Sequence, residues 1–171
     1  MTKKRKRFFT RAGAILIALA AVVSLSIFVR TTYLVLTNDS SGAVLYRVRL
    51  NEGDEFSISF IHSVNISPVT EIYEIRQGEI VLTVLEFYTF GAGMPTQIEP
   101  YQTLVRLPDG GMRVEGFDRV IGNLRYIIGH TAGQTLNAAN REILLTDLDE
   151  AGQTVLFAVR RLNIWQRVIM N

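Results

Sequence analysis

The sequence contains no cysteine. Disulfides, thiolate zinc sites, iron–sulfur clusters and cysteine nucleophiles are therefore excluded. Lysine is also missing beyond Lys6. Residues 1–30 carry seven Lys and Arg and no acid, whereas residues 31–171 carry eleven Arg and all sixteen Asp and Glu. The formal charge of +2 and the pI near 9.1 therefore reflect a basic tail, and the mildly acidic remainder argues against nucleic-acid binding.

The composition is that of a folded protein. Of the 171 residues, 48% are hydrophobic and 20% are charged, which excludes a disordered chain. Once one apolar segment near the start is set aside, about 140 residues remain, enough for one domain with a core of its own.

An uncharged apolar run covers residues 12–29. As a helix with a rise of about 1.5 Å per residue, it would nearly cross the ~30 Å hydrocarbon layer of a bilayer. Because five of residues 3–7 are Lys or Arg, we expect the N-terminus to stay in the cytoplasm. The sequence therefore predicts a single-pass protein of the cell membrane with a basic cytoplasmic tail (1–11), a transmembrane signal anchor (12–29) and an extracytoplasmic β domain (31–171).

Two processing outcomes stay open for the apolar segment. A cleavable signal peptide needs small residues after its apolar core, and Ser24-Leu25-Ser26 offers such a site. The apolar run continues through Ile27, Phe28 and Val29, however. This continuation favours an uncleaved anchor over a cleaved signal peptide.

Beyond Arg30 the pattern changes to short apolar–polar runs, and no long amphipathic helix is indicated. Turn signals such as Pro108-Asp109-Gly110-Gly111 separate the runs. This spacing is typical of an all-β fold, a single antiparallel sandwich or barrel-like domain. The expected strands are 33–37, 44–50, 56–62, 69–76, 80–90, 103–107, 112–115, 124–130, 141–145 and 154–160. Residues 162–170 are compatible with a strand or a short helix.

Polar residues converge within the meander predicted for 56–62, 69–76 and 80–90. A two-residue turn at Gln77-Gly78 would pair 76 with 79, 75 with 80, 73 with 82, 71 with 84 and 69 with 86. A loop over 63–68 would pair 60 with 71 and 62 with 69. Since side chains alternate across a sheet, His62, Glu71 and Glu86 would then gather at one end of one face, beside Gly91–Pro95. A slip of one residue would turn the affected side chains to the other face.

Three interpretations of this polar cluster stay open. Buried carboxylates need partners, so the favoured one is a structural knot that fixes strand register. A binding site for a ligand or a protein comes second, and acid–base chemistry or a metal site third. An imidazole beside carboxylates would titrate near neutral pH, which suits the second and third interpretations.

One further group of residues stands near the end of the printed sequence. Trp165 lies close to Arg160, Arg161 and Arg167. The group is either a surface that faces a partner or, the favoured interpretation, a rim of arginines around an indole in the core.

Three short motifs follow one another at close spacing: Phe60-Ile61-His62-Ser63-Val64, then Pro68-Val69-Thr70-Glu71, then Gly91-Ala92-Gly93-Met94-Pro95. Together they resemble the bacterial family of domains of unknown function numbered eighteen-fifty, over about residues 33–160. The resemblance implies a small exported or membrane-anchored protein, often encoded beside tripartite ATP-independent periplasmic (TRAP) transporters with a TAXI-type solute receptor. It marks as motif positions His62, Ser63, Pro68, Glu71, Gly91, Gly93 and Pro95.

We therefore expect a membrane-anchored extracytoplasmic accessory protein that binds a TAXI-type TRAP transporter, through its membrane subunit or its solute receptor. The alternative is a module that binds or senses a small carboxylate. A small enzyme is the least favoured option, and the absence of a G-x-S-x-G elbow argues against a hydrolase in particular. We expect no catalytic residue, cofactor, metal or nucleic acid. The candidate binding residues are His62, Ser63, Glu71, Glu86, Gly91, Gly93, Met94 and Pro95.

Overall fold

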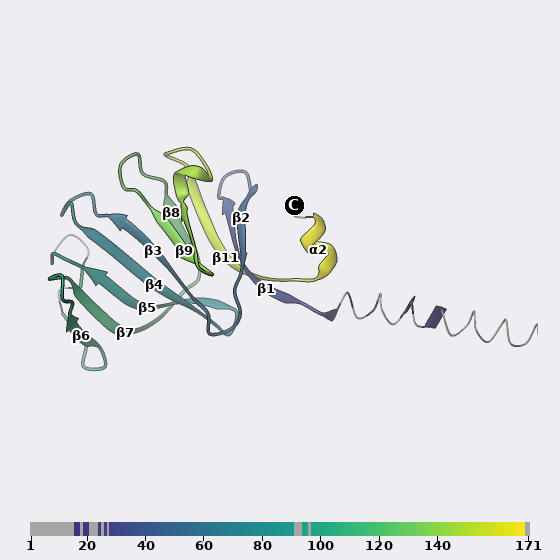
Figure 1. Cartoon of the computed structure of the whole chain (residues 1–171), viewed down its shortest axis with the longest axis horizontal. Coiled ribbons are helices and arrows are strands. Elements are labelled where there is room, and N and C mark those ends of the chain that lie inside the picture. Colours follow the sequence, from purple (N-terminus) through teal and green to yellow (C-terminus); the bar gives the residue numbers. More distant parts are fainter. Residues whose placement is uncertain are drawn as a thin grey trace, which may run out of the picture. The chain divides into compact units, whose positions relative to one another are not determined.

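The computed structural model describes residues 16–17, 19–20, 24, 26, 28–90, 94–95 and 97–169 (Figure 1). Contacts divide the chain into two units, one formed by Met1–Thr31 with Arg161–Asn171 and the other by Thr32–Arg160. The elements are β1 (Thr31–Asn38), β2 (Val44–Arg49), β3 (Glu55–Ile61), β4 (Pro68–Arg76), β5 (Glu79–Phe87), β6 (Thr103–Arg106), β7 (Met112–Ile121), β8 (Leu124–Ile127), β9 (Thr135–Ala138), β10 (Arg141–Leu144), the 3-10 turn η1 (Leu145–Asp147), β11 (Thr154–Leu162) and α2 (Ile164–Ile169).

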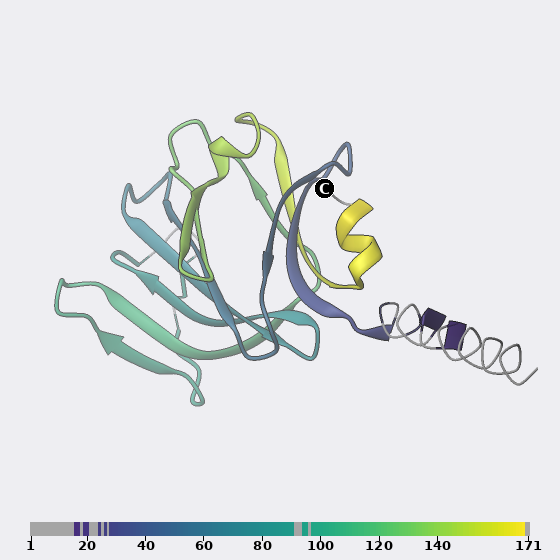
Figure 2. The ribbon, with the colours of Figure 1, turned by 45° about the vertical axis from the view of Figure 1, so that its right-hand side comes forward.

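The strands of the larger unit form a β-sandwich, as the sequence predicts (Figures 1 and 2). A four-stranded sheet has the order β2-β1-β11-β8, and a seven-stranded sheet has the order β10-β9-β3-β4-β5-β7-β6. All neighbours in the larger sheet run antiparallel. Strands joined by tight turns can pair in this way without crossover helices, which explains why the sequence shows none.

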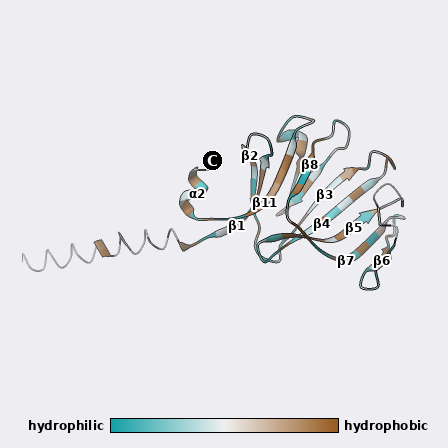
Figure 3. Ribbon diagram, turned by 180° about the vertical axis from the view of Figure 1, so that it is seen from behind, coloured by the Kyte–Doolittle hydropathy of each residue, from teal (hydrophilic) through white to brown (hydrophobic). Residues whose placement is uncertain are grey.

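The core lies between the two sheets and follows from the alternation of apolar residues along each strand (Figure 3). Ile58 of the larger sheet and Leu34 of the smaller one are fully buried. Phe56 stacks on Tyr73 with 5.1 Å between ring centroids, and Phe157 lies 6.5 Å from Phe56. Burial of each such side chain contributes about 1.5–3 kcal/mol, so this face determines which side of each strand turns inward.

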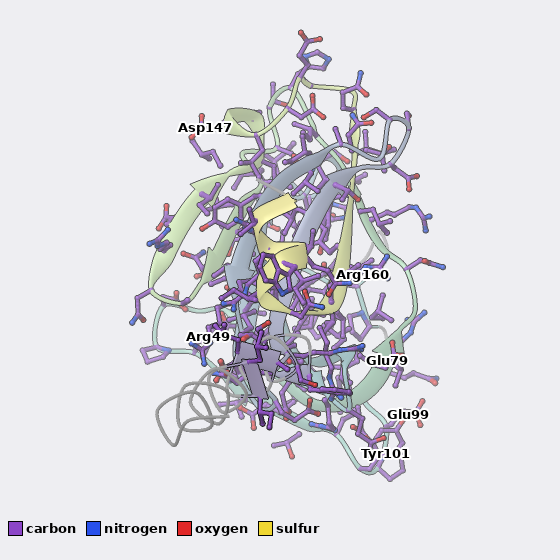
Figure 4. The ribbon with its side chains drawn as sticks, turned by 90° about the vertical axis from the view of Figure 1, so that its right-hand side faces the viewer. Arg49, Glu79, Glu99, Tyr101, Asp147 and Arg160 are labelled. Atoms are coloured by element: carbon purple, nitrogen blue, oxygen red, sulfur yellow. The ribbon has the colours of Figure 1, made fainter. Side chains whose placement is uncertain are left out.

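A second, smaller apolar cluster lies towards the β7 side of the larger sheet. Its buried members are Val69, Leu85, Phe87, Met112 and Val114. Met94 and Ile98, from the connection between β5 and β6, pack against it. Beyond it the edge strand β6 is exposed along its whole length, with Glu99 and Tyr101 projecting near its start (Figure 4). The connection therefore covers apolar surface on the larger sheet.

Ten expected strands are present, and the structure adds two features. β9 was not expected; it has only four residues, of which Leu136 and Ala138 are buried. β7 continues past Glu115 to Ile121, because Gly116 (φ 87°) and Asp118 (φ 45°) interrupt the alternation without ending the strand. Residues 162–170, left open between strand and helix, contain α2.

Most of the expected anchor, residues 12–29, lies outside the described residues. Among those that the structure does describe, no helix is long and apolar enough to span a membrane.

The turn between β4 and β5 provides a test of local backbone strain. Gln77 has φ 55° and Gly78 has φ 77°, as in the predicted two-residue turn. Asparagine adopts this left-handed conformation more easily than glutamine. We expect Gln77→Asn to raise the free energy of unfolding by about 0.5–1 kcal/mol, measured by urea denaturation. Gln77→Val should lower it by a similar amount, and equal midpoints for the two variants would contradict this account.

Candidate functional site

The strand directions assign the loops of the sandwich to two ends. Residues 50–54 and the Gln77-Gly78 turn lie together, since Gly53 N donates to Ile75 O at 2.8 Å. Tyr33 pairs with Arg49, so β1 begins at this same end, which we call the entry end. Loops 62–67, 88–90 and 128–134 lie at the opposite end, where Ile61 N donates to Ala132 O at 2.8 Å. We call this the motif end, because His62, Ser63 and Pro68 of the family-like motifs lie there.

His62 begins the loop between β3 and β4. Its Nδ1 accepts the backbone N–H of Val64 at 3.2 Å and that of Asn65 at 3.4 Å. The backbone N–H of His62 donates to Ser67 O at 2.9 Å, and the backbone N–H of Ile66 donates to His62 O at 2.8 Å. Through these bonds the imidazole and the backbone of His62 hold the tight loop together.

The expected register of the β3–β4 hairpin is wrong by two residues. Phe60 pairs with Val69 and Ile58 pairs with Glu71, and His62 lies beyond the last pair, Ile61 with Pro68. Because the shift is an even number of residues, each side chain still points to the same face of the sheet. The loop is displaced because His62 closes it through the bonds to Ser67 and Ile66 instead of joining the ladder.

Glu71 lies between the two sheets with two tyrosines. Tyr73 donates its hydroxyl to Glu71 Oε2 at 2.9 Å. Tyr126, from β8 of the other sheet, also donates to Glu71 Oε2, and its hydroxyl lies 3.0 Å from that of Tyr73. The carboxylate of Glu71, which is half-buried, thus finds partners, and the three side chains connect the sheets through oxygen atoms beside the apolar core.

The surroundings change the titration of this cluster. Burial raises the pKa of Glu71 above its ordinary value, and the hydrogen bond from Tyr73 opposes this in part. Burial and the neighbouring Glu71 raise the pKa of Tyr73, so this phenol stays protonated and remains a donor. The carboxyl is therefore held where its charged form is costly.

Glu86 does not join Glu71, contrary to the sequence prediction. The pairs 76 with 79, 75 with 80 and 73 with 82 are confirmed, but β5 then carries an extra residue, Thr83, and the register shifts. Glu71 consequently pairs with Leu85, and Glu86 pairs with Thr70 on the outer face. There Arg113 Nη1 donates to Glu86 Oε1 at 2.6 Å, and Arg113 Nε donates to Glu115 Oε1 at 2.7 Å.

Of the remaining candidate residues, the structure describes Ser63, Met94 and Pro95. Gly91 and Gly93 lie outside the described residues. Met94 packs against the second apolar cluster, and Pro95 is half-buried. Ser63 is exposed in the loop after β3. Met94 therefore has a packing role that its sequence context did not indicate.

The structure thus separates the predicted cluster into three environments: the His62 loop, the interior beside Glu71 and the outer face at Glu86. In the ranges that the structure describes, no three His, Asp or Glu side chains are placed to hold a metal ion. Sequence reasoning missed Tyr126 and Arg113, because each comes from a strand distant in sequence. No local signal connects them to Glu71 or Glu86.

Apolar side chains are exposed at the motif end. Val64 and Ile66 are 69% and 73% exposed, and Ile61, Tyr88 and Phe90 are also exposed. Asn65 Nδ2 donates to Thr89 O at 3.4 Å and joins the two loops that carry them. We call Ile61, Val64, Ile66, Tyr88 and Phe90 the end patch. Its apolar V-N-I segment in a loop was a signal that sequence reasoning did not use.

Open cavities occur elsewhere on the larger unit. One of about 680 Å³ is lined by residues such as Ser57, Ile72, Asn137 and Glu142, which share the outer face of the larger sheet. Another of about 330 Å³ lies beside Arg113 and Glu115. Both are wide depressions with charged rims, and neither involves the end patch.

The model of the family described as "Domain of unknown function (DUF1850)" matches residues 56–145. This is more than half of the chain, so the chain belongs to that family, and the resemblance seen in the sequence is confirmed over a range narrower than 33–160. The match includes the sequence motifs at residues 60–71 and 91–95 and the carboxylates of Glu71 and Glu86. No curated protein and no solved structure matches the chain significantly.

The Glu71 cluster predicts a pH-dependent stability. Because the folded state raises the pKa of Glu71, it binds the proton more tightly than the unfolded chain does. The free energy of unfolding should therefore fall as the pH rises from the ordinary carboxyl range through the raised pKa. Glu71→Gln removes this titration, so its free energy of unfolding should fall less between pH 4 and 7, measured by urea denaturation of the full chain in detergent.

Two further variants complete this test. Glu142→Gln, at an exposed carboxylate, should keep the wild-type pH profile. Glu71→Ala leaves both tyrosine hydroxyls without their acceptor and should cost about 1–3 kcal/mol. Identical slopes for Glu71→Gln and wild type would show that the carboxyl titrates normally in the fold.

Proposed function

We propose that this member of the DUF1850 family is a membrane-anchored extracytoplasmic accessory protein that binds a TAXI-type TRAP transporter, through its membrane subunit or its solute receptor. The binding surface in this proposal is the end patch. The choice of this transporter as the partner follows from the gene neighbourhood that the family resemblance implies. The exposed apolar end patch is the structural observation that supports binding.

The end patch has the chemistry of a protein-binding surface. Large apolar side chains gathered on two adjoining loops are typical of interaction sites, whereas isolated ones are ordinary. The loops are fixed at their bases by antiparallel strands and to each other by Asn65 and Thr89. Binding loops on a rigid scaffold lose little conformational entropy when a partner docks.

Charge favours a protein over a small carboxylate as the ligand. Residues 61–70 and 87–98 contain no Asp, Glu, Lys or Arg. A carboxylate site usually presents a cation, most often arginine, for a bidentate contact. His62 Nδ1 already accepts two backbone N–H groups. Apolar contact with a protein surface therefore fits these loops better.

The proposed membrane anchoring is supported by the first thirty residues of the sequence. The basic cluster at residues 3–7 and the apolar run at 12–29 have the order of a signal anchor. Where the structure describes this run, its apolar side chains are exposed, with Phe28 at 78% and Ile17 at 73%. Such exposure is costly in water and favourable in lipid.

The proposal is tested by capture of the transporter subunits. Tagged full-length chain, solubilised in mild detergent from membranes that contain the transporter and its receptor, should retain one of them. Val64→Asp with Ile66→Asp places charges in the end patch and should weaken retention by at least about tenfold, equivalent to ~1.4 kcal/mol. Binding is measured by quantitative immunoblot or interferometry with the purified receptor.

Val120→Asp provides the matched control. Val120 is 60% exposed on β7, outside the end patch, and its variant should bind like wild type. Equal losses for both variants would show a general defect instead of a specific surface. Retention of neither subunit, together with thermal stabilisation by a small carboxylate, would favour the alternative of a small-molecule module.

A further inference from the structure

The helix α2 exposes an apolar face. Ile164, Trp165 and Val168 are exposed, Trp165 at 54% and Val168 at 67%. Their spacing of one and four residues places them side by side on a helix. The sequence favoured an indole in the core. This prediction is wrong, because Trp165 lies on the surface.

Trp165 contacts the apolar run near the start of the chain. Its indole Nε1 donates to Ser26 Oγ at 3.0 Å, and both residues belong to the same compact unit. Ser26 lies three residues before Val29, where the uncharged run ends, and Arg30 follows. The indole is therefore level with the last turn of the expected anchor.

The charges around α2 complement this position. Residues 151–171 contain three Arg and no Asp or Glu. Arg161 precedes the helix, and Arg167 lies in its last turn. Tryptophan and arginine concentrate where hydrocarbon meets lipid headgroups, since an indole is apolar with one N–H donor and arginine can extend its charge into water.

We propose that α2 is an interfacial helix, which lies in the outer leaflet beside the anchor with Ile164, Trp165 and Val168 in the headgroup boundary. This inference rests on the proposed membrane anchor and deepens it, because it adds a second point of membrane contact. A lipid surface is the occupant favoured by the bond to Ser26, which fixes the helix at the end of the apolar run. Interfacial helices of this kind carry an apolar face and a basic polar face.

The single tryptophan of the chain makes the position of α2 measurable. Full-length chain is reconstituted into vesicles of phosphatidylcholine with a minority of phosphatidylglycerol, and flotation confirms that it is in the membrane. Lipids brominated near the headgroup end of their acyl chains should quench most of the Trp165 emission, whereas aqueous acrylamide should quench little. Bromine near the chain ends should be less effective, because an interfacial indole is shallow.

Substitutions then separate the lipid contact from the fold. Ile164→Ser with Val168→Ser should reduce quenching by brominated lipid and increase quenching by acrylamide. Val120→Ser, at an equally exposed site on β7, should leave both unchanged.

Other outcomes distinguish this inference from the proposed function. Chain that floats with the vesicles but has Trp165 open to acrylamide, or shielded from both quenchers, would overturn the interfacial helix and leave the anchor standing. Chain that does not float would overturn the anchor, and the interfacial helix with it.

Discussion

The arrangement of polar groups in this sandwich depends on one extra residue in β5. Thr83 has no partner in the β4–β5 register, and its Oγ1 donates to Ile72 O at 3.1 Å. Between the turn and this bulge, the residue pairs are those that the two-residue turn sets. Beyond the bulge, every residue of β5 is shifted by one position relative to β4. Leu85 thereby faces the interior beside Glu71, whereas Glu86 faces outward to Arg113. A regular strand would turn Glu86 to the same inward face as Glu71, where two neighbouring charges of one sign are costly.

With one carboxylate inside, the interior can satisfy it. Tyr73 and Tyr126 reach Glu71 from the two sheets, and burial raises the pKa of this carboxyl. Their hydroxyls use a polar end on an apolar body, so that the aromatic rings still fill the core. The cluster connects the sheets and leaves the loops at the motif end available for other contacts.

In the described part of the chain, the end patch and the face of α2 are exposed apolar surfaces, and each suits a different surrounding. The end patch lies on loops without charge, at the end of the sandwich opposite Thr32. The face of α2 lies beside Ser26, with arginines near it and no acid in residues 151–171. Uncharged apolar loops suit a protein surface, whereas an apolar helix with basic neighbours suits lipid headgroups. The proposed accessory role uses both, one to hold the membrane and the other to reach a partner.

The sequence by itself determined the all-β class, the position of most strands and the turn at Gln77-Gly78, because alternation and turn chemistry are local properties. The family motifs were also readable, since they lie within forty residues of one another. The tertiary structure decided which of the motif residues meet. Thr83 carries no local signal for a bulge, and Tyr126 reaches Glu71 only when two sheets pack face to face. Likewise, the sequence around Trp165 does not show which segment its side chain contacts. Only the hydrogen bond to Ser26 places it beside the apolar run. Contacts between distant segments depend on register and packing, which no short stretch of sequence encodes.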